Sequence, residues 1–305
     1  MLKHGFIIIA HSYLDQLDKI IEVLSFPNHY FFINIDRKNV DASNFMKRYE
    51  NRCDVCFLKG KERMEVAHAG YSMVECTLKL LRLAMKNGMD YYHLMSGLDF
   101  PCRSNMEFDD FFQKHMGTSY MLMDSDNYRQ ECMERKYLSR IKPWYFYDVP
   151  YRNIGLVDMF VRFSNRISRK IWWRKDITEL WGAWQWFSWY KTVAEYVVSE
   201  EKNNPSFFKR FHHTSCSDEL IFATLLYRKR EQLNIVADNS LRYINWEKEV
   251  EGRKQKNHPL ILNENDYEDI LKSGAFFCRK VNPTISSKLL VLLEKRKRRF
   301  VNDFN

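Results

Sequence analysis

The first 125 residues alternate between short apolar runs and amphipathic segments, and this alternation restricts the possible folds more than any other feature. Residues 6–10 (FIIIA) form a continuous β-rich run, which is typical of a strand covered on both faces. Residues 14–24 carry leucine and isoleucine at helical spacing, and residues 30–35 form a second apolar run. This order predicts a βαβ unit with two parallel strands.

The same rhythm continues along the chain. Further strands are predicted at 55–58, 91–95, 119–123, 182–190, 241–246 and 275–278. Further helices are predicted at 72–85, 105–114, 193–199, 218–229 and 267–272. The pattern predicts an α/β fold with a central, parallel-rich mixed sheet flanked by helices. Residues 126–180 interrupt it as a basic and aromatic insertion that is partly helical, and residues 285–305 predict a basic amphipathic helix.

The net charge of +9 is concentrated in two stretches. Residues 161–175 hold six lysines and arginines and no acid, and residues 285–305 hold six against two acids. Such patches attract phosphorylated substrates, anionic lipid or nucleic acid. No helix-turn-helix, zinc-finger or RNA-binding motif occurs, so nucleic acid is not an expected partner. Peripheral contact with an anionic membrane is expected.

The seven cysteines are odd in number and scattered, which favours reduced thiols. Cys53 and Cys56 form a lone CxxC pair with no second pair to complete a zinc site. The apolar run at residues 6–10 is too short for a secretory signal, and no run of 18 apolar residues occurs. We therefore expect a cytoplasmic protein, peripheral on the inner face of the plasma membrane.

Two polar segments lie where α/β enzymes build their sites. The segment 91–101 (YYHLMSGLDFP) runs from a strand into a turn that contains Asp99. Asp218 and Glu219 place two carboxylates at the start of an apolar helix. Loops at the carboxyl ends of strands commonly carry catalytic groups. The two carboxylates also suit simple capping of the helix.

Eight segments between residues 6 and 281 occur in the order of one family. They are IIIAHSYLDQLDKIIEVL, FFINIDRK, AHAGYSMVECTLKLLRLAM, YYHLMSGLDFP, GAWQWF, SDELIFATLL, LRYINW and GAFFCRKV. The chain resembles the core-2/I-branching β-1,6-N-acetylglucosaminyltransferases, a family that includes the peptide xylosyltransferases. The resemblance implies a GT-A-like fold, inverting transfer from a UDP-sugar, and no metal or other cofactor. It implies one catalytic domain at 1–284, whose parts are a nucleotide-sugar half (1–125), the insertion (126–180) and an acceptor half (181–284).

The resemblance assigns the central chemistry to a few residues. Glu219 matches the catalytic glutamate, which takes the proton of the acceptor hydroxyl. Asp218 beside it is expected at the helix start and near the acceptor. Arg279 and Lys280 match basic residues after the last strand, and Lys280 matches the lysine that meets the diphosphate. A second upstream clamp residue is not identified among the basic residues at 253–256.

Other positions match contacts to the nucleotide and the sugars. His11, Asp36 and Tyr71 match positions near the nucleotide, with uridine expected over the first βαβ unit. Asp99 is either a sugar contact or a carboxylate that organises its loop. The remaining expected acceptor-side residues are Glu131, Glu134, Arg135, Trp184 and Trp186.

One motif favours a different chemistry. The strand at 120–123 is followed by Asp124-Ser125-Asp126, the arrangement with which metal-dependent glycosyltransferases hold manganese. The expected function is transfer of N-acetylglucosamine from UDP-GlcNAc to a hydroxyl of a glycan, as a β-1,6 branch on a lipid-linked acceptor in surface polysaccharide or glycoconjugate synthesis. The alternatives are a UDP-xylose-dependent xylosyltransferase and a non-catalytic protein that binds glycans or polyanions.

Overall fold

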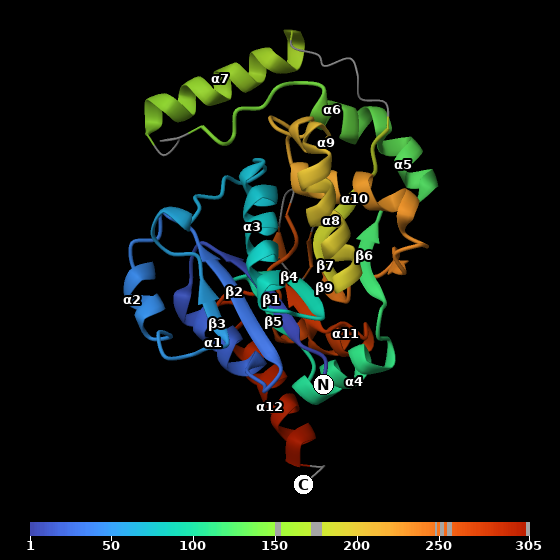
Figure 1. Cartoon of the computed structure of the whole chain (residues 1–305). Helices are drawn as coiled ribbons and strands as arrows, with labels where there is room; N and C mark the ends of the chain where they lie inside the picture. Colours follow the sequence, from blue (N-terminus) through green and yellow to red (C-terminus); the bar gives the residue numbers. More distant parts are fainter. Residues whose placement is uncertain (150–153, 172–178, 248, 251–252, 255–257, 303–305) are drawn as a thin grey trace.

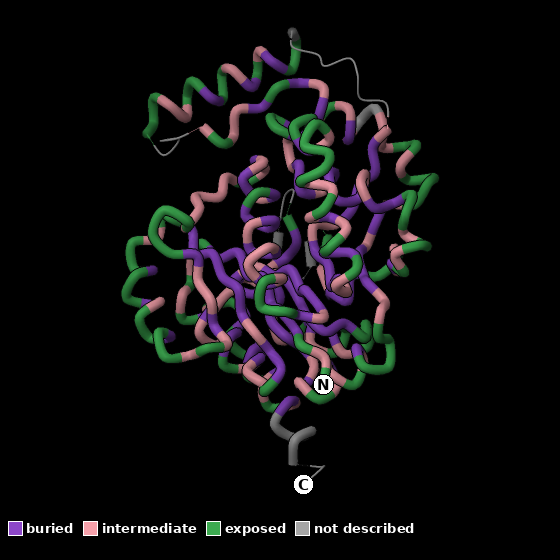
Figure 2. The backbone as a smooth tube through the Cα atoms, viewed as in Figure 1, coloured by how far each residue is buried: buried purple, intermediate pink, exposed green. Residues whose placement is uncertain are grey.

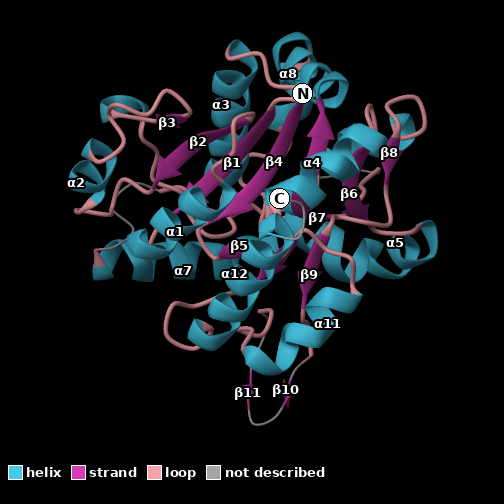
Figure 3. Cartoon of the chain, turned by 90° about the horizontal axis from the view of Figure 1, so that it is seen from below, coloured by secondary structure: helices cyan, strands magenta, loops and turns pink. Residues whose placement is uncertain are grey.

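The computed structural model describes residues 1–149, 154–171, 179–247, 249–250, 253–254 and 258–302. Its centre is a seven-stranded sheet in the order β3-β2-β1-β4-β7-β6-β8, with helices on both faces (Figures 1 and 3). The strands of this sheet are β1 (His4–Ala10), β2 (His29–Ile35), β3 (Val55–Phe57), β4 (Tyr91–Ser96), β6 (Ser119–Met123), β7 (Ala183–Tyr190) and β8 (Ile235–Val236). The other strands are β5 (Asp99–Pro101), β9 (Arg242–Ile244), β10 (Glu249–Val250), β11 (Arg253–Lys254) and β12 (Phe277–Arg279).

Helices fill most of the connections. The α-helices are α1 (Leu14–Leu24), α2 (Ala42–Lys47), α3 (Ser72–Lys86), α4 (Asn105–Lys114), α5 (Asp126–Cys132), α6 (Ser139–Ile141), α7 (Gly155–Ile171), α8 (Lys191–Asn203), α9 (Pro205–Lys209), α10 (Ile221–Leu226), α11 (Tyr267–Lys272) and α12 (Ser287–Asn302). The short 3₁₀ turns are η1 (Gly60–Glu62), η3 (Ser217–Glu219), η4 (Tyr227–Lys229) and η5 (Glu264–Asp266), and η2 (Met133–Leu138) is a π-helix.

The strands β1, β2, β3 and β4 run parallel, so their carboxyl ends meet at one edge of the sheet. Ala10 is paired with Ile35, and Ile9 is paired with Ser96. The loops that follow these strands therefore emerge side by side, and we call this edge the carboxyl edge. Strand β7 is antiparallel to both of its neighbours, which makes the sheet mixed.

Alternate side chains of β1 enter two separate cores. Phe6 and Ile8 pack with residues of α1, α4 and α12, whereas Ile7 and Ile9 pack with residues of α3, α8 and α10. A strand directs successive side chains to opposite faces, so a strand covered on both faces has to be apolar at every position. The predicted α/β fold with a mostly parallel mixed sheet flanked by helices is confirmed.

Two predictions of local structure were wrong. Residues 218–229, predicted as one helix, form η3, α10 and η4, because Leu220 departs from helical geometry with φ −118°. The segment after β4 is predicted as a plain turn, but it forms β5, which pairs with β12 in a small three-stranded sheet. Within the described residues, no helix is both long and apolar enough to cross a membrane.

Candidate active site

Glu219 lies in the η3 turn, which is held by the loop that leads into α3. Cys216, just before the turn, has φ 52°, and its N–H donates to the carbonyl of Ala69 at 2.9 Å. The hydroxyl of Ser217 donates to the carbonyl of Gly70 at 3.4 Å. These contacts hold the Glu219 turn against the segment that precedes α3.

The carboxylate of Glu219 forms an ion pair with Arg140, through Oε2 and Nη1. Among the described residues, no donor reaches the other oxygen, and about a third of the Glu219 side chain is exposed. Burial disfavours the charge of Arg140, but the neighbouring Glu219, Cys216 and Asp218 groups raise the pKa of Arg140 overall. Arg140 was missed in the sequence because it lies 79 positions from Glu219, among other basic residues.

Asp218 has a different environment from its neighbour. Its side chain is buried, and burial together with the charge of Glu219 raises the pKa of Asp218 to about 7. Two adjacent carboxyl groups with different environments take different protonation states at the same pH. Since Asp218 lies inside η3 and α10 begins at Ile221, Asp218 is not at the α-helix start as predicted.

A buried ion pair organises the loop between β4 and β5. Asp99 accepts from Arg279 at 2.8 Å and from the backbone N–H of Ser96 at 2.9 Å. The guanidinium of Arg279 lies 3.7 Å from the ring centroid of Trp186. All three side chains are buried, and burial lowers the pKa of Arg279, with the charge of Asp99 opposing it. This geometry favours a positioning role for Asp99 and Arg279.

Lys280 follows Arg279 and lies near two histidines, His68 and His258. Burial and the charge of Arg279 lower the pKa of Lys280. Burial and the charges of Lys280 and His68 lower the pKa of His258, whose ring centroid lies 5.8 Å from that of His68. Among the described residues, no carboxylate forms an ion pair with Lys280. Because His68 directly precedes Ala69, this group of side chains (His68, His258 and Lys280), which we call the Lys280 cluster, borders the loop that holds Glu219.

The predicted nucleotide-side residues gather near the carboxyl edge. His11 is exposed after β1, and Tyr13 in the same loop accepts from Asn282, two residues after Lys280, at 3.3 Å. Asp36 is buried after β2, and both of its oxygens accept backbone N–H groups, from Lys38 at 2.9 Å and from Val66 at 2.8 Å. The carboxylate of Asp36 therefore already shapes its own loop.

Tyr71 lies at the start of α3 with its ring 4.0 Å from that of His212. The N–H groups of Tyr71 and Ser72 donate to Asp148 at 2.6 and 3.3 Å. A Cβ at Gly70 would lie 2.1 Å from a carboxylate oxygen of Asp148, so only glycine fits there. The insertion thus caps α3, which the sequence did not reveal.

A pocket of about 380 Å³ lies beside this cap. It is lined by Arg37, Lys61, Met64, Glu65, Ala67, Ser72, Glu75, Lys79, Tyr147, Asp148 and Val149. Neither Glu219 nor Lys280 lines it. The pocket connects the loop after Asp36 with the insertion, next to the predicted nucleotide side.

The predicted acceptor-side residues are spread over several elements. Trp184 lies 6.0 Å from Trp246 between ring centroids, and Trp246 is half-exposed, so this pair offers an aromatic surface for a sugar. Glu131 is exposed on α5. The side chains of Glu134 and Arg135 lie outside the described part of the structure.

The Asp124-Ser125-Asp126 motif is engaged by protein groups. Asp124 accepts from the hydroxyl of Tyr137 and lies 3.9 Å from Lys136. Asp126 begins α5 and interacts with Tyr227. The two carboxylates do not belong to a group of three metal-ligating side chains within the described residues. The structure therefore gives no support to a metal site built on this motif.

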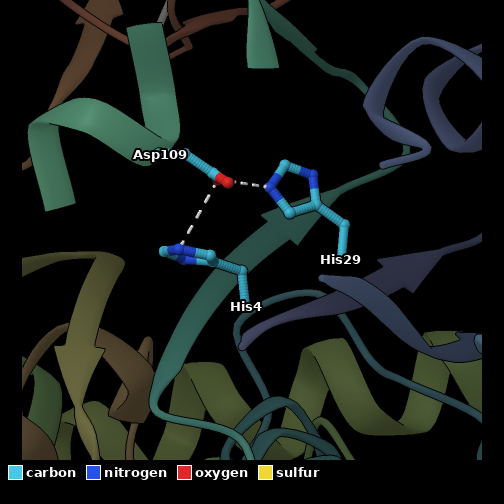
Figure 4. Close-up of side chains that lie close together, drawn as sticks. All are labelled: His4, His29 and Asp109. Atoms are coloured by element: carbon cyan, nitrogen blue, oxygen red, sulfur yellow. Dashed lines mark hydrogen bonds and ion pairs between the residues drawn. The ribbon is translucent and has the colours of Figure 1, made fainter. Parts of the chain in front are cut away.

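His4, His29 and Asp109 form a separate cluster at the opposite, amino edge of the sheet (Figure 4). Asp109 lies 2.9 Å from Nε2 of His29 and 3.7 Å from Nε2 of His4. The other ring nitrogen of His29 lies 2.7 Å from the carbonyl of Leu24, so both nitrogens of His29 have hydrogen-bond partners. The protein groups themselves thus complete the surroundings of this histidine, and we interpret the cluster as structural.

Comparison with known proteins places the chain in a family. The family model described as Core-2/I-Branching enzyme matches residues 5–271. The chain therefore belongs to the Core-2/I-Branching enzyme family, which is a family of glycosyltransferases.

Among curated relatives, Xylosyltransferase 2 of Rattus norvegicus is 21% identical over 318 residues, covering 96% of this chain and 33% of the relative. Xylosyltransferase oxt of Drosophila pseudoobscura pseudoobscura is 21% identical over 298 residues, covering 92% and 32%. The chain thus spans about a third of the length of these relatives.

Two solved structures match the chain with low TM-scores and low sequence identity. The apo form of mouse Xyloside xylosyltransferase 1 gives a TM-score of 0.40 at 12% identity, covering 93% of this chain and 99% of that one. Staphylococcus aureus TarS 1–349 gives a TM-score of 0.30 at 14% identity, covering 48% and 42%.

Proposed function

We propose that this chain is an inverting glycosyltransferase that moves N-acetylglucosamine from UDP-GlcNAc to a hydroxyl of a glycan, forming a β-1,6 branch in surface polysaccharide or glycoconjugate synthesis. The observation that carries the proposal is the arrangement around the loop at residues 66–70. One side of this loop holds the Glu219 turn, and the other side borders the Lys280 cluster. A base for the acceptor and a positive site for the leaving diphosphate are the two parts that the reaction requires.

In the proposed step, the acceptor oxygen attacks the anomeric carbon while the bond from that carbon to the diphosphate oxygen breaks. The hydroxyl proton passes to Glu219, and the electron pair of the broken bond leaves with UDP. Arg140 holds Oε2 of Glu219, which orients the other oxygen toward the acceptor. Lys280 stabilises the charge that develops on UDP. Burial and the charge of Arg279 lower the pKa of Lys280, and an arriving diphosphate supplies a counter-charge that opposes both effects.

Asp99, Arg279 and Trp186 have a supporting role in this proposal. Their buried contacts fix the end of β12, and hence the backbone from which Lys280 projects. Trp184 and Trp246 form a surface on which the apolar face of a sugar ring stacks. His11, Asp36 and Tyr71 remain the proposed nucleotide-side residues, with Asp36 acting through its loop.

A second donor has direct support from the comparisons. The curated relatives are named xylosyltransferases, which favours UDP-xylose as the alternative donor. The same residues serve either sugar, because the base and the leaving group are unchanged.

The test is UDP release from a panel of UDP-sugars, with glycan acceptors, in the presence and absence of EDTA. Release from UDP-GlcNAc that survives EDTA is the expected result, and release from UDP-xylose instead would select the alternative donor. Release that EDTA abolishes and manganese restores would contradict the metal-free mechanism. Tight binding of glycans with no release from any donor would instead support a non-catalytic binding protein.

A further inference from the structure

Helix α7 has polar side chains on its buried face and apolar side chains on its exposed face, the reverse of an ordinary surface helix. Its inward face is formed by Val161, Asn165 and Ser168, which are buried. Asn165 accepts from the N–H of Phe146 at 2.8 Å, and Ser168 accepts from the N–H of Trp144 at 2.7 Å. Polar side chains thus attach the helix to the protein, whereas a surface helix normally buries its apolar stripe.

The outward side of α7 is apolar. Leu156, Met159, Phe160 and Phe163 are 74%, 63%, 68% and 61% exposed. They follow the spacing of three and four residues that places side chains on one face of a helix. Figure 1 shows α7 across the top of the molecule, at the opposite end from both termini, and Figure 2 shows exposed residues along its length. We call these four residues the outward face.

A row of cations runs beside the outward face. Its members are Arg162, Arg166, Arg169 and Lys170, all of them exposed. Asp158 is paired with Arg162 at 2.6 Å and is the only acid of α7. An exposed apolar stripe with a basic row at its side is the pattern of a helix that lies in the plane of a membrane interface.

We propose that the outward face of α7 docks this protein on an anionic lipid bilayer. The apolar side chains enter the boundary between headgroups and acyl chains, and the basic row meets the lipid phosphates. A second copy of the chain fits less well, because an antiparallel two-fold contact of α7 with itself would bring two basic rows together. Over the described side chains of α12, residues 287–297, the leucines Leu289, Leu290 and Leu293 are buried in the core and form no equivalent outward face.

The position of α7 links docking to the active site. Ser168 holds the backbone of Trp144, and Arg140, four residues before Trp144 in the chain, pairs with Glu219. A bilayer beneath α7 would therefore lie on the side of the protein from which the insertion approaches the proposed base. On the basis of the proposed function, we infer that the acceptor glycan is presented on a membrane lipid and enters from this side.

The experiment is flotation of the full chain with vesicles of phosphatidylcholine alone or with phosphatidylglycerol. The test variant carries Met159→Ser, Phe160→Ser and Phe163→Ser together. The matched control carries Val291→Ser and Leu292→Ser, which replace partly exposed apolar residues on α12. We expect binding to the anionic vesicles to fall about tenfold or more in the α7 variant and to stay unchanged in the control.

A second variant, with Arg162→Gln, Arg166→Gln and Arg169→Gln, is expected to lose the preference for anionic over neutral vesicles. Wild-type binding by the α7 variant, or no binding by the wild type, would overturn the inference. Loss of a dimer in the α7 variant, seen by light scattering without any vesicle binding, would overturn it in favour of a second copy.

Transfer to a soluble glycan, measured on the same proteins, keeps the two proposals separate. We expect the α7 variant to retain it. A wild type that floats with vesicles but transfers no sugar would contradict the proposed function and leave the docking of α7 standing.

Discussion

Ionisable side chains gather at both edges of the main sheet. At the amino edge a group of histidines is buried, whereas at the carboxyl edge the Lys280 cluster is exposed or half-buried. At the amino edge, His4, His29 and His93 are fully buried among aromatic rings. A ring nitrogen of His4 lies 3.0 Å from one of His93, and His29 lies 2.9 Å from Asp109. At the carboxyl edge, Lys280 and its histidine neighbours are exposed or half-buried, and no described carboxylate pairs with Lys280.

The difference suggests that the side chains at one edge of the sheet serve the stability of the fold and those at the other edge serve binding. A buried polar group that already has its partners contributes to the folded state and offers nothing to a ligand. Burial and the charge of Arg279 disfavour the charged form of Lys280, and an arriving anion opposes both effects. We therefore expect substitutions at the amino edge to lower the stability of the protein, and substitutions at the carboxyl edge to lower its activity.

The largest effect is expected for Glu219→Gln, which keeps the shape of the side chain but removes the base. Transfer should fall about a thousandfold, since general-base catalysis contributes in this range. Donor binding should be kept, and single-turnover kinetics with a parallel UDP-binding titration measure the two. Transfer near the wild-type rate would show that another group takes the proton.

The amino edge is tested with Asp109→Asn, which breaks the contact with His29. The free energy of unfolding should fall by about 2 kcal/mol, because the buried ring of His29 loses its hydrogen bond to a charged acceptor. Chemical denaturation measures this change. Activity per folded molecule should stay the same, and a selective loss of activity would erase the distinction between the two edges.

At the carboxyl edge, Lys280→Ala should lower kcat/KM about a hundredfold with no comparable loss of stability. Lys280→Arg should recover part of the activity, because it keeps a cation near the leaving group. Lys288→Ala is the control, since Lys288 pairs with Glu264 on the surface at 3.0 Å. Equal effects of the two alanine variants would argue against a diphosphate at Lys280.

A pH dependence of stability is expected from the buried histidines. Burial lowers the pKa of His4 to about 3 and that of His93 well below its usual value, and neighbouring histidine charge adds to both shifts. The unfolded chain binds these protons below about pH 6.5, so stability is lost as the pH falls from there, by about 1.4 kcal/mol per pH unit for each histidine.

Asp218 acts in the opposite direction on this pH profile. Its raised pKa means that the folded state holds a proton between the ordinary aspartate value and about pH 7, so this term stabilises the protein as the pH falls. Denaturation of the wild type and of His4→Phe at pH 7 and pH 5 separates the contributions. A shallower decline is expected in His4→Phe, and an equal decline would remove His4 as a source.

Local pattern predicted most of the fold. Helix α1 has the bounds that its spacing predicts, and the strands of the first βαβ unit lie within a residue or two of the expected positions. Each of these elements depends on side chains close in sequence. The motif resemblance also led to Glu219 and Lys280, whose surroundings suit their proposed roles.

Long-range partners could not be predicted in the same way. Arg140 looks like any other basic residue of the insertion until the fold brings it to Glu219. Arg279 reads as a free cation in the sequence, but Asp99, 180 positions away, neutralises it. From the sequence, Asp36 is predicted to contact the nucleotide, but its two oxygens accept hydrogen bonds from backbone N–H groups of Lys38 and Val66. Only the folded chain shows which charges are already compensated.

The cap of α3 by Asp148 also affects the order in which the protein assembles. A helix usually receives its cap from a residue just before it, but α3 receives one from 77 positions downstream. While the chain is being synthesised, α3 emerges with its first N–H groups in water and gains this partner only after Asp148 has emerged. The turn that contains Glu219 is hydrogen-bonded to the loop that directly precedes α3. The proposed nucleotide side can thus form early, but the loop that supports the Glu219 turn matures only after the insertion has docked.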